Sequence, residues 1–162
     1  MIEPIIYNFS KRKLETEYDC MKKKIALSIT FLASLLPMLL NQYGGCKGVQ
    51  EITGLVNLLN PIGIMAVALF VVGVWLPFKK QILGKILGAL GAIGIVVSEV
   101  YEFFTWHVLT ITGEVSIQHS IRFAFPEFYI GLVVSLAMVV AYFVIDKKLS
   151  NIPAPELTGP QA

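Results

Sequence analysis

The segment ILGKILGALGAIGIVVSEVYEFF, Ile82–Phe104, decides the fold. Its glycines Gly84, Gly88 and Gly91 recur at spacings of four and three, so an α-helix places them on one face, and Ser98 falls close to the same direction. Small residues on one stripe let a neighbouring backbone approach closely, as they do between membrane helices. We predict that these residues form a helix-packing face inside a bundle, with a contact between two copies of the chain as the alternative.

The composition is typical of a chain whose solvent is a bilayer. Apolar residues make up 56% of the 162 residues and charged residues 15%, against about 45–50% and about 25% in soluble domains. The apolar residues gather into stretches at Ile25–Tyr43, Pro61–Phe78, Ile82–Phe104 and Pro126–Ile145. Each has close to the roughly 17–25 residues that cross a hydrocarbon core. We therefore predict an all-α, multi-pass membrane protein with four transmembrane helices in an up-and-down bundle.

Prolines mark the limits of these stretches. Asn60 and Pro61 offer a capping side chain followed by a proline at the first helical position, where its missing N–H costs nothing. Pro126 likewise starts the last stretch, with the Glu127 carboxylate placed at the positive end of the helix dipole. Pro77 is expected to end the second stretch, and Pro37 is expected to kink the first one.

Basic residues are distributed unevenly over the segments between these stretches. Of the 13 Lys and Arg residues, eleven lie before Ile25, in 79–85 or after Ile145, and Lys47 and Arg122 lie in the two remaining connections. Lys and Arg favour the cytoplasmic side of a membrane. The asymmetry predicts cytoplasmic termini and two external loops, in a plasma membrane that we take to be prokaryotic. The expected domains are a basic leader 1–24, a membrane domain 25–145 and a flexible tail 146–162.

The segment MKKKIALSITFLASLLPMLLNQYGGC, Met21–Cys46, has features of a secretory leader. A basic stretch followed by an apolar one suits a signal peptide, with Met21 as an alternative start, although the apolar run is slightly longer than the usual ~7–15 residues. Glycines before Cys46 suit a lipoprotein cleavage site, but Tyr43 occupies the position where such sites carry leucine. We expect an uncleaved first span, with lipoprotein processing at Cys46 and ordinary cleavage as the alternatives.

Two carboxylates, Glu99 and Glu102, lie near the outer end of the third span, and His107 follows them. Acidic residues at membrane depth are costly and usually face protein or water. They predict either a cation, proton or polar-ligand site at the external mouth or carboxylates that reach water at the headgroup level, with Arg122 as the natural counter-ion. A metal site is not predicted, because the metal-binding carboxylate bundles carry a Glu-x-x-His motif on each of two helices and this chain does not. We likewise expect no cofactor.

Apolar residues recur at different spacings in the two external loops. In VSIQHSIRFAF, Val115–Phe125, apolar and polar residues alternate, which is typical of a strand. A glycine-containing turn precedes this stretch, so we predict that residues 105–125 form a short β-hairpin capping the external end of the bundle. In the other external loop, apolar residues between Val49 and Leu59 recur at helical spacing and predict a short amphipathic helix.

No motif for enzymatic chemistry is present, since the sequence lacks a CxxC, a P-loop, an HExxH and a nucleophile elbow. The basic runs flank spans rather than marking a soluble fold that binds nucleic acid. We predict a non-enzymatic accessory, regulatory or interaction subunit that acts through its helical surface and external loops. Its expected partners are the lipid bilayer and another membrane protein or a second copy. The alternative is an oligomeric transporter or channel component with an acidic site near the external mouth.

Overall fold

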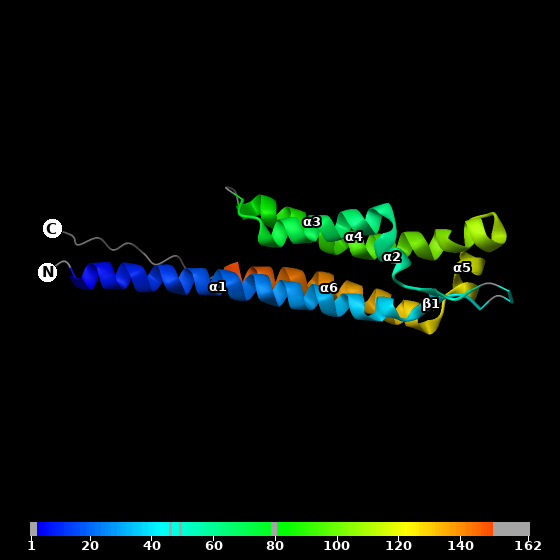
Figure 1. Cartoon of the computed structure of the whole chain (residues 1–162), viewed down its shortest axis with the longest axis horizontal. Coiled ribbons are helices and arrows are strands. Elements are labelled where there is room, and N and C mark those ends of the chain that lie inside the picture. The colour runs from blue at the N-terminus through cyan, green and yellow to red at the C-terminus, as the bar shows by residue number, and fades with distance from the viewer. Residues whose placement is uncertain (1–2, 46, 49, 79–80, 151–162) are drawn as a thin grey trace.

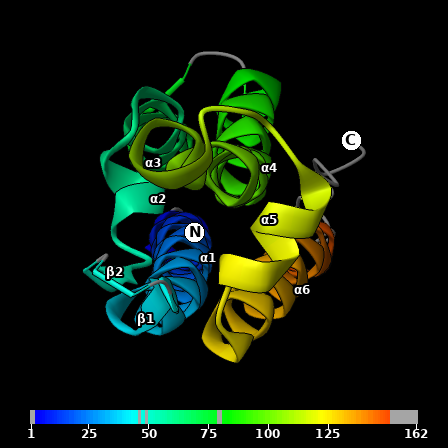
Figure 2. The same cartoon turned by 90° about the vertical axis from the view of Figure 1, so that its right-hand side faces the viewer.

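Four long helices lie side by side as an antiparallel bundle (Figure 1) in the computed structural model, which describes residues 3–45, 47, 48, 50–78 and 81–150. They are α1 Glu3–Leu35, α3 Pro61–Trp75, α4 Gln81–His107 and α6 Pro126–Ser150. Seen along the bundle axis, they occupy four corners in the order α1, α3, α4, α6 (Figure 2). The protein is mostly helical, as predicted, and α1 begins well beyond the other helices at the end where α6 finishes.

Short elements close the opposite end of the bundle, which we call the capped end. They are a 3₁₀ turn Leu36–Leu39, β1 Asn41–Tyr43, β2 Ile52–Thr53, α2 Val56–Leu59, a π-helical turn Val108–Thr112 and α5 Ile117–Phe123. β1 pairs with β2 in antiparallel fashion, and Tyr43 also forms a bridge with Ala124. The two connections at this end are therefore joined to each other through β1.

The helix boundaries follow the prolines. The Asn60 side chain accepts a hydrogen bond from the Gly63 backbone N–H at 2.8 Å, with Pro61 at the start of α3, so this cap forms as predicted. α3 ends at Trp75, before Pro77. Pro37 does not kink a continuing helix: α1 stops at Leu35, and Pro37 lies in the 3₁₀ turn that follows, because proline cannot donate the next helical hydrogen bond.

α3 and α4 approach each other closely along a glycine seam. A Cβ atom on Gly91 would lie 2.6 Å from the Phe70 Cα atom, and one on Gly73 would lie 2.7 Å from the Gly84 carbonyl oxygen. A Cβ on Gly88 would meet the Tyr142 ring of α6, at 3.1 Å from Cε2. The glycine stripe thus lies against two neighbouring helices inside the bundle, where only hydrogen atoms fit.

Apolar packing fills the bundle between the capped end and the opposite end, which we call the basic end. The Phe31 and Phe70 rings stack with their centroids 3.9 Å apart and join α1 to α3. At the basic end, Asp146 of α6 pairs with Lys23 of α1 and, at 3.3 Å, with Lys85 of α4. One carboxylate thereby links three helices.

The outer surface of the bundle is apolar. Leu32 of α1, Met65 of α3 and Val133 of α6 are 61%, 63% and 64% exposed. By length and composition, two helices could cross a membrane, namely α4 and residues Pro126–Lys148 of α6. α3 is apolar but has 15 residues, about 22 Å of helix against roughly 30 Å of hydrocarbon. Of the expected spans, two therefore have the necessary length on their own.

The predicted β-hairpin over residues 105–125 is wrong. α4 continues to His107 and is followed by the π-helical turn and by α5. Alternation over so short a stretch also fits a helical turn, and a helix satisfies its backbone hydrogen bonds internally whereas the hairpin needed a partner strand. Ile117 and Ile121, expected on a covered sheet face, are instead 60% and 56% exposed.

The predicted amphipathic helix between Val49 and Leu59 is present only at its end. Ile52–Thr53 forms β2, and the helix α2 covers only Val56–Leu59. Gly54 separates the two elements and lies against the side chain of Gln42, whose Oε1 atom would be 2.5 Å from a Cβ placed there. Pairing with β1 therefore replaced the first turns of the expected helix. Val49 lies outside the described residues.

Gly91→Leu tests the glycine seam. The added side chain would meet the backbone of α3, which cannot move aside as a side-chain tip can, so we expect a loss of about 3 kcal/mol. Ala68→Leu is the matched control, because Ala68 is exposed on α3 and should tolerate leucine within about 0.5 kcal/mol. Thermal unfolding in detergent measures both, and equal stability of the two variants would place the seam outside the core.

Intact-mass spectrometry tests the fate of the first span. Cleavage before Cys46 would remove α1 and the 3₁₀ turn after it, which contribute Leu27, Phe31 and Met38 to the buried core. We therefore expect the purified protein to retain this segment. A mass that lacks everything before Cys46, or a diacylglyceryl adduct on it, would contradict this expectation; Cys46 itself lies outside the described residues.

Candidate functional site

Buried polar side chains meet inside the bundle just below the capped end. We call them the polar cluster: Gln42, Tyr43, Asn57, Asn60, Ser98, Glu99, Glu102 and Ser135. They come from β1, from α2 and the residue that caps α3, from the outer third of α4, and from α6. A short strand, a helix cap and two long helices thus converge on one place. Because buried polar groups are costly unless they are hydrogen-bonded, their bonding decides what the cluster can do.

Asn60 is the central residue on the α3 side of the cluster. Its Oδ1 atom caps α3, while its Nδ2 group donates to Ser98 Oγ at 2.8 Å and to Glu102 Oε1 at 2.9 Å. Ser98 Oγ in turn donates to the backbone carbonyl of Asn57. One amide therefore fixes the start of α3, the rotation of α4 and the position of the Glu102 carboxyl.

Asn57 connects this group to the strand that closes the bundle. Its Nδ2 group donates to Gln42 Oε1 at 2.9 Å, and its Oδ1 atom accepts from the Tyr43 hydroxyl at 3.0 Å. The Tyr43 ring packs against Trp106 and Phe128, with centroids 5.2 Å and 5.5 Å away. Aromatic rings therefore separate the polar cluster from the surface of the capped end.

Glu99 lies on the other side of α4, against α6. Its side chain accepts one hydrogen bond, from Ser135 Oγ to Oε1 at 2.7 Å. Its second oxygen, Oε2, is buried and has no hydrogen-bond partner among the described residues. The carboxyl is 1% exposed and Glu102 is 7% exposed. Both glutamates thus face protein, and the expectation that they reach water at the headgroup level is wrong.

His107 occupies a separate contact at the end of α4. Its Nδ1 atom lies 2.9 Å from Thr112 Oγ1 and its Nε2 atom lies 2.9 Å from Ser120 Oγ. The ring is fully buried and ties the π-helical turn to α5. Thr112 and Ser120 are thus its hydrogen-bond partners, and His107 serves the cap rather than the pair of glutamates.

The expected role of Arg122 as counter-ion is not supported. Its side chain is exposed, and its guanidinium lies 5.8 Å from the centre of the Phe123 ring. Among the residues that the structure describes, the ion pairs do not join Arg122 to Glu99 or Glu102. Because residues 117–123 form a helix rather than a hairpin strand, the arginine is turned outward instead of being brought back over the bundle.

The sequence analysis identified Asn60 only as a helix cap, and it missed Asn57 and Gln42 as members of the polar cluster. Asn57 and Asn60 stand in NLLN, and Gln42 stands in NQY, each beside an apolar stretch. An amide residue next to a membrane span usually reads as a solvated loop, although spacing of three places Asn57 and Asn60 near one helical face. Ser135 was also missed, because a single serine in an apolar helix commonly bonds to its own backbone.

The groups in the polar cluster decide what it can bind. In the described part of the chain, no three His, Cys, Asp or Glu side chains are grouped as a metal centre would require. The site offers carboxyl, amide and hydroxyl groups but no activated nucleophile. It can hold a proton or a small polar species.

Comparison with known proteins gives no further guide: neither a family model, nor a curated protein, nor a solved structure matches this chain.

Asn60→Asp tests the central amide. The aspartate keeps the capping oxygen but loses the donors to Ser98 and Glu102, so we expect a loss of about 3 kcal/mol in unfolding experiments. Asn41→Asp is the matched control, since Asn41 also donates to a glutamate, Glu51, at 2.7 Å, but on the exposed surface. It should cost no more than about 1 kcal/mol.

A second substitution separates the loss of the Asn60–Glu102 hydrogen bond from a general loss of stability. Glu102→Gln in the Asn60→Asp background restores a donor opposite the new carboxylate and should recover part of the loss, a coupling that a double-mutant cycle measures. Equal losses for Asn60→Asp and Asn41→Asp, with no recovery, would mean that Glu102 is solvated.

Proposed function

We propose that this chain is a four-span membrane protein with both termini in the cytoplasm, and that it acts as an accessory or regulatory interaction subunit. The observation that carries the proposal is the contrast between its closed interior and its apolar outer surface. A protein that conducts or transports through its own bundle needs a polar path, whereas an interaction subunit needs an outer surface that another membrane protein recognises.

The interior supports this choice. Between the polar cluster and the basic end, buried apolar side chains fill the bundle: Leu27, Phe31, Phe70, Val74, Ala92, Met138 and Tyr142. Tyr142 additionally donates from its hydroxyl to the Lys85 backbone carbonyl at 2.9 Å and fixes α6 against α4. A polar species in the cluster would therefore meet a packed apolar layer, which disfavours a conduit through one protomer.

The distribution of charge supports the orientation. Lys23, Lys85 and Asp146 lie at the basic end, and Lys147 and Lys148 follow on α6. The positive-inside tendency favours a cytoplasmic position for this end. α1 and α3, which have shorter apolar segments, would complete the bundle by packing against the full-length α4 and α6 rather than by spanning alone.

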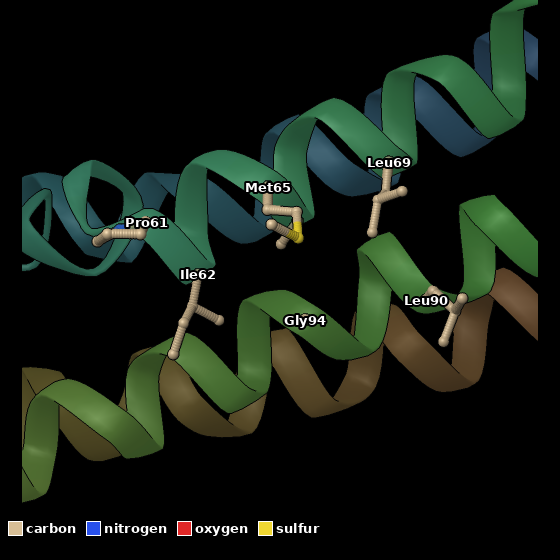
Figure 3. A pocket seen from close by; sticks show the side chains of 7 residues that line it. Pro61, Ile62, Met65, Leu69, Leu90 and Gly94 are labelled. Carbon is tan, nitrogen blue, oxygen red and sulfur yellow. The ribbon is translucent and has the colours of Figure 1, made fainter.

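A groove on the outer face of the α3–α4 pair is the surface that best fits a partner (Figure 3). It has a volume of about 220 Å³. Its lining residues are Pro61, Ile62, Met65, Ala66, Leu69, Leu90 and Gly94. Ala66 and Gly94 lie where α3 and α4 pack against each other, and the exposed side chains of Met65 and Leu90 line the groove beside them. Methionine adapts to irregular partners. The occupant that we propose is an apolar transmembrane helix of a partner protein.

Met65→Trp tests the proposal against Val133→Trp. Both residues are exposed to the same extent, 63% and 64%, but Met65 lines the groove and Val133 lies on α6. We expect the protein from native membranes, extracted in nanodiscs, to have the mass of a complex of fixed stoichiometry. That complex should persist in Val133→Trp and be lost in Met65→Trp, with unchanged thermal stability. A chain that is alone, or bound only to lipid, in all three samples would contradict the proposal.

Flux measurements address the alternative. Proteoliposomes containing only this chain should show no more proton or alkali-ion flux than empty liposomes, because the apolar layer closes the bundle. Flux that Phe70→Ala increases would instead favour the transporter or channel interpretation.

A further inference from the structure

We propose that the Glu99 carboxyl, buried between α4 and α6, is a proton-binding site that keeps its proton at neutral pH in the folded protein. The inference does not depend on the proposed partner or groove. It rests on where the carboxyl lies, on what its oxygens contact, and on which charges face it.

Glu99 lies deep in the helices that could cross a membrane. It precedes the end of α4 by eight residues and Ser135 follows the start of α6 by nine, which are about 12 Å and about 14 Å along the two helices. At 1% exposure, the side chain is closed off from solvent by protein. An ionised carboxylate in such a place loses its hydration, and the loss is far smaller for the neutral acid.

The hydrogen bonding at Glu99 fits a protonated carboxyl group, because one of its two oxygens has no hydrogen-bond partner among the described residues. Ser135 donates to Oε1, while Oε2 is buried without a hydrogen-bond partner among the described residues. A stable buried carboxylate usually accepts several hydrogen bonds or faces a cation. A hard metal ion would take about six or more oxygen ligands, which one open carboxyl oxygen does not supply. A proton on Oε2 needs no such set.

The charged and titratable groups around Glu99 give it no compensation. On its own helix it is followed by Glu102, and from β1 it faces the neutral phenol of Tyr43. From α6 it meets Ser135, and α2 and α3 bring only the amides Asn57 and Asn60 to the same cluster. The lysines Lys23 and Lys85 form ion pairs with Asp146 at the basic end, and Arg122 is exposed on α5. An ionised Glu99 would therefore be buried with one hydrogen bond and no facing cation among the described residues, which favours its protonated form.

Infrared spectroscopy of the full chain in nanodiscs tests the proposal directly. A protonated carboxyl has a C=O stretch that an ionised one lacks. We expect this band in the wild-type protein at about pH 7, well above the ordinary range of a glutamate, and its absence in Glu99→Gln. Glu102→Gln, the matched control one helical turn away, should retain it. Identical spectra for the wild type and Glu99→Gln would overturn the proposal.

Two further measurements keep the test decisive. Sodium or lithium ions added at constant pH should leave the wild-type band unchanged, and loss of the band would assign the site to an alkali cation instead.

Thermal unfolding checks the linkage: the folded protein holds a proton that the unfolded chain releases, so wild-type stability should fall as pH rises. Glu99→Gln, which keeps the shape and the neutral state, should remove that slope, whereas parallel curves would overturn the proposal. If Glu99→Gln does not fold, Ser135→Ala, which removes the hydrogen bond to Glu99 Oε1, should shift the frequency of the wild-type band, and an unchanged frequency overturns the proposal.

Discussion

The close approach of α3 and α4 is the constraint on which the rest of the structure depends. Because glycine hydrogens are the only atoms that fit between Gly91 and the Phe70 backbone, the two helices have essentially one relative position. That position places Ser98 and Glu102, about two and three turns beyond Gly91 along α4, beside the residue that caps α3. Helix packing thus aligns the polar cluster, and the cluster in turn holds the start of α3. The apolar seam and the polar bonds stabilise the same arrangement.

The parts of the fold that the sequence predicted are those with local causes. Pro61 and Pro126 mark helix starts because proline is well tolerated at the first helical position. The spacing of Gly84, Gly88 and Gly91 identifies one face of a helix without knowledge of the helix that packs on it. The external loops were misread because their conformation depends on distant residues. β2 exists because Tyr43 and Asn41 offer it a partner, and residues 117–123 are helical because Ser120 bonds to His107 and Phe123 packs on Trp106.

The residues of the candidate site likewise differ in how far the sequence alone could identify them. Glu99 and Glu102 stand out in any reading, since carboxylates are rare in apolar helices. Their partners do not, because Asn57, Asn60 and Ser135 are ordinary residues until the bundle brings them together. Arg122 shows the converse: charge complementarity suggested a pairing that the backbone forbids. Opposite charges in a sequence indicate a bond only when the elements that carry them are known to meet.

The length of α1 has a mechanical consequence. From Ile5 to Leu35 the helix contains neither glycine nor proline, so its 33 residues form one rod about 50 Å long. Its outer part projects beyond the bundle, while its inner part carries Lys23 and Phe31. A force applied to the projecting part acts as torque on a lever whose fulcrum is the Lys23–Asp146 ion pair. Rotation of that rod would reach the Phe31–Phe70 stack directly, so a displacement of the projecting part is mechanically connected to the centre of the bundle.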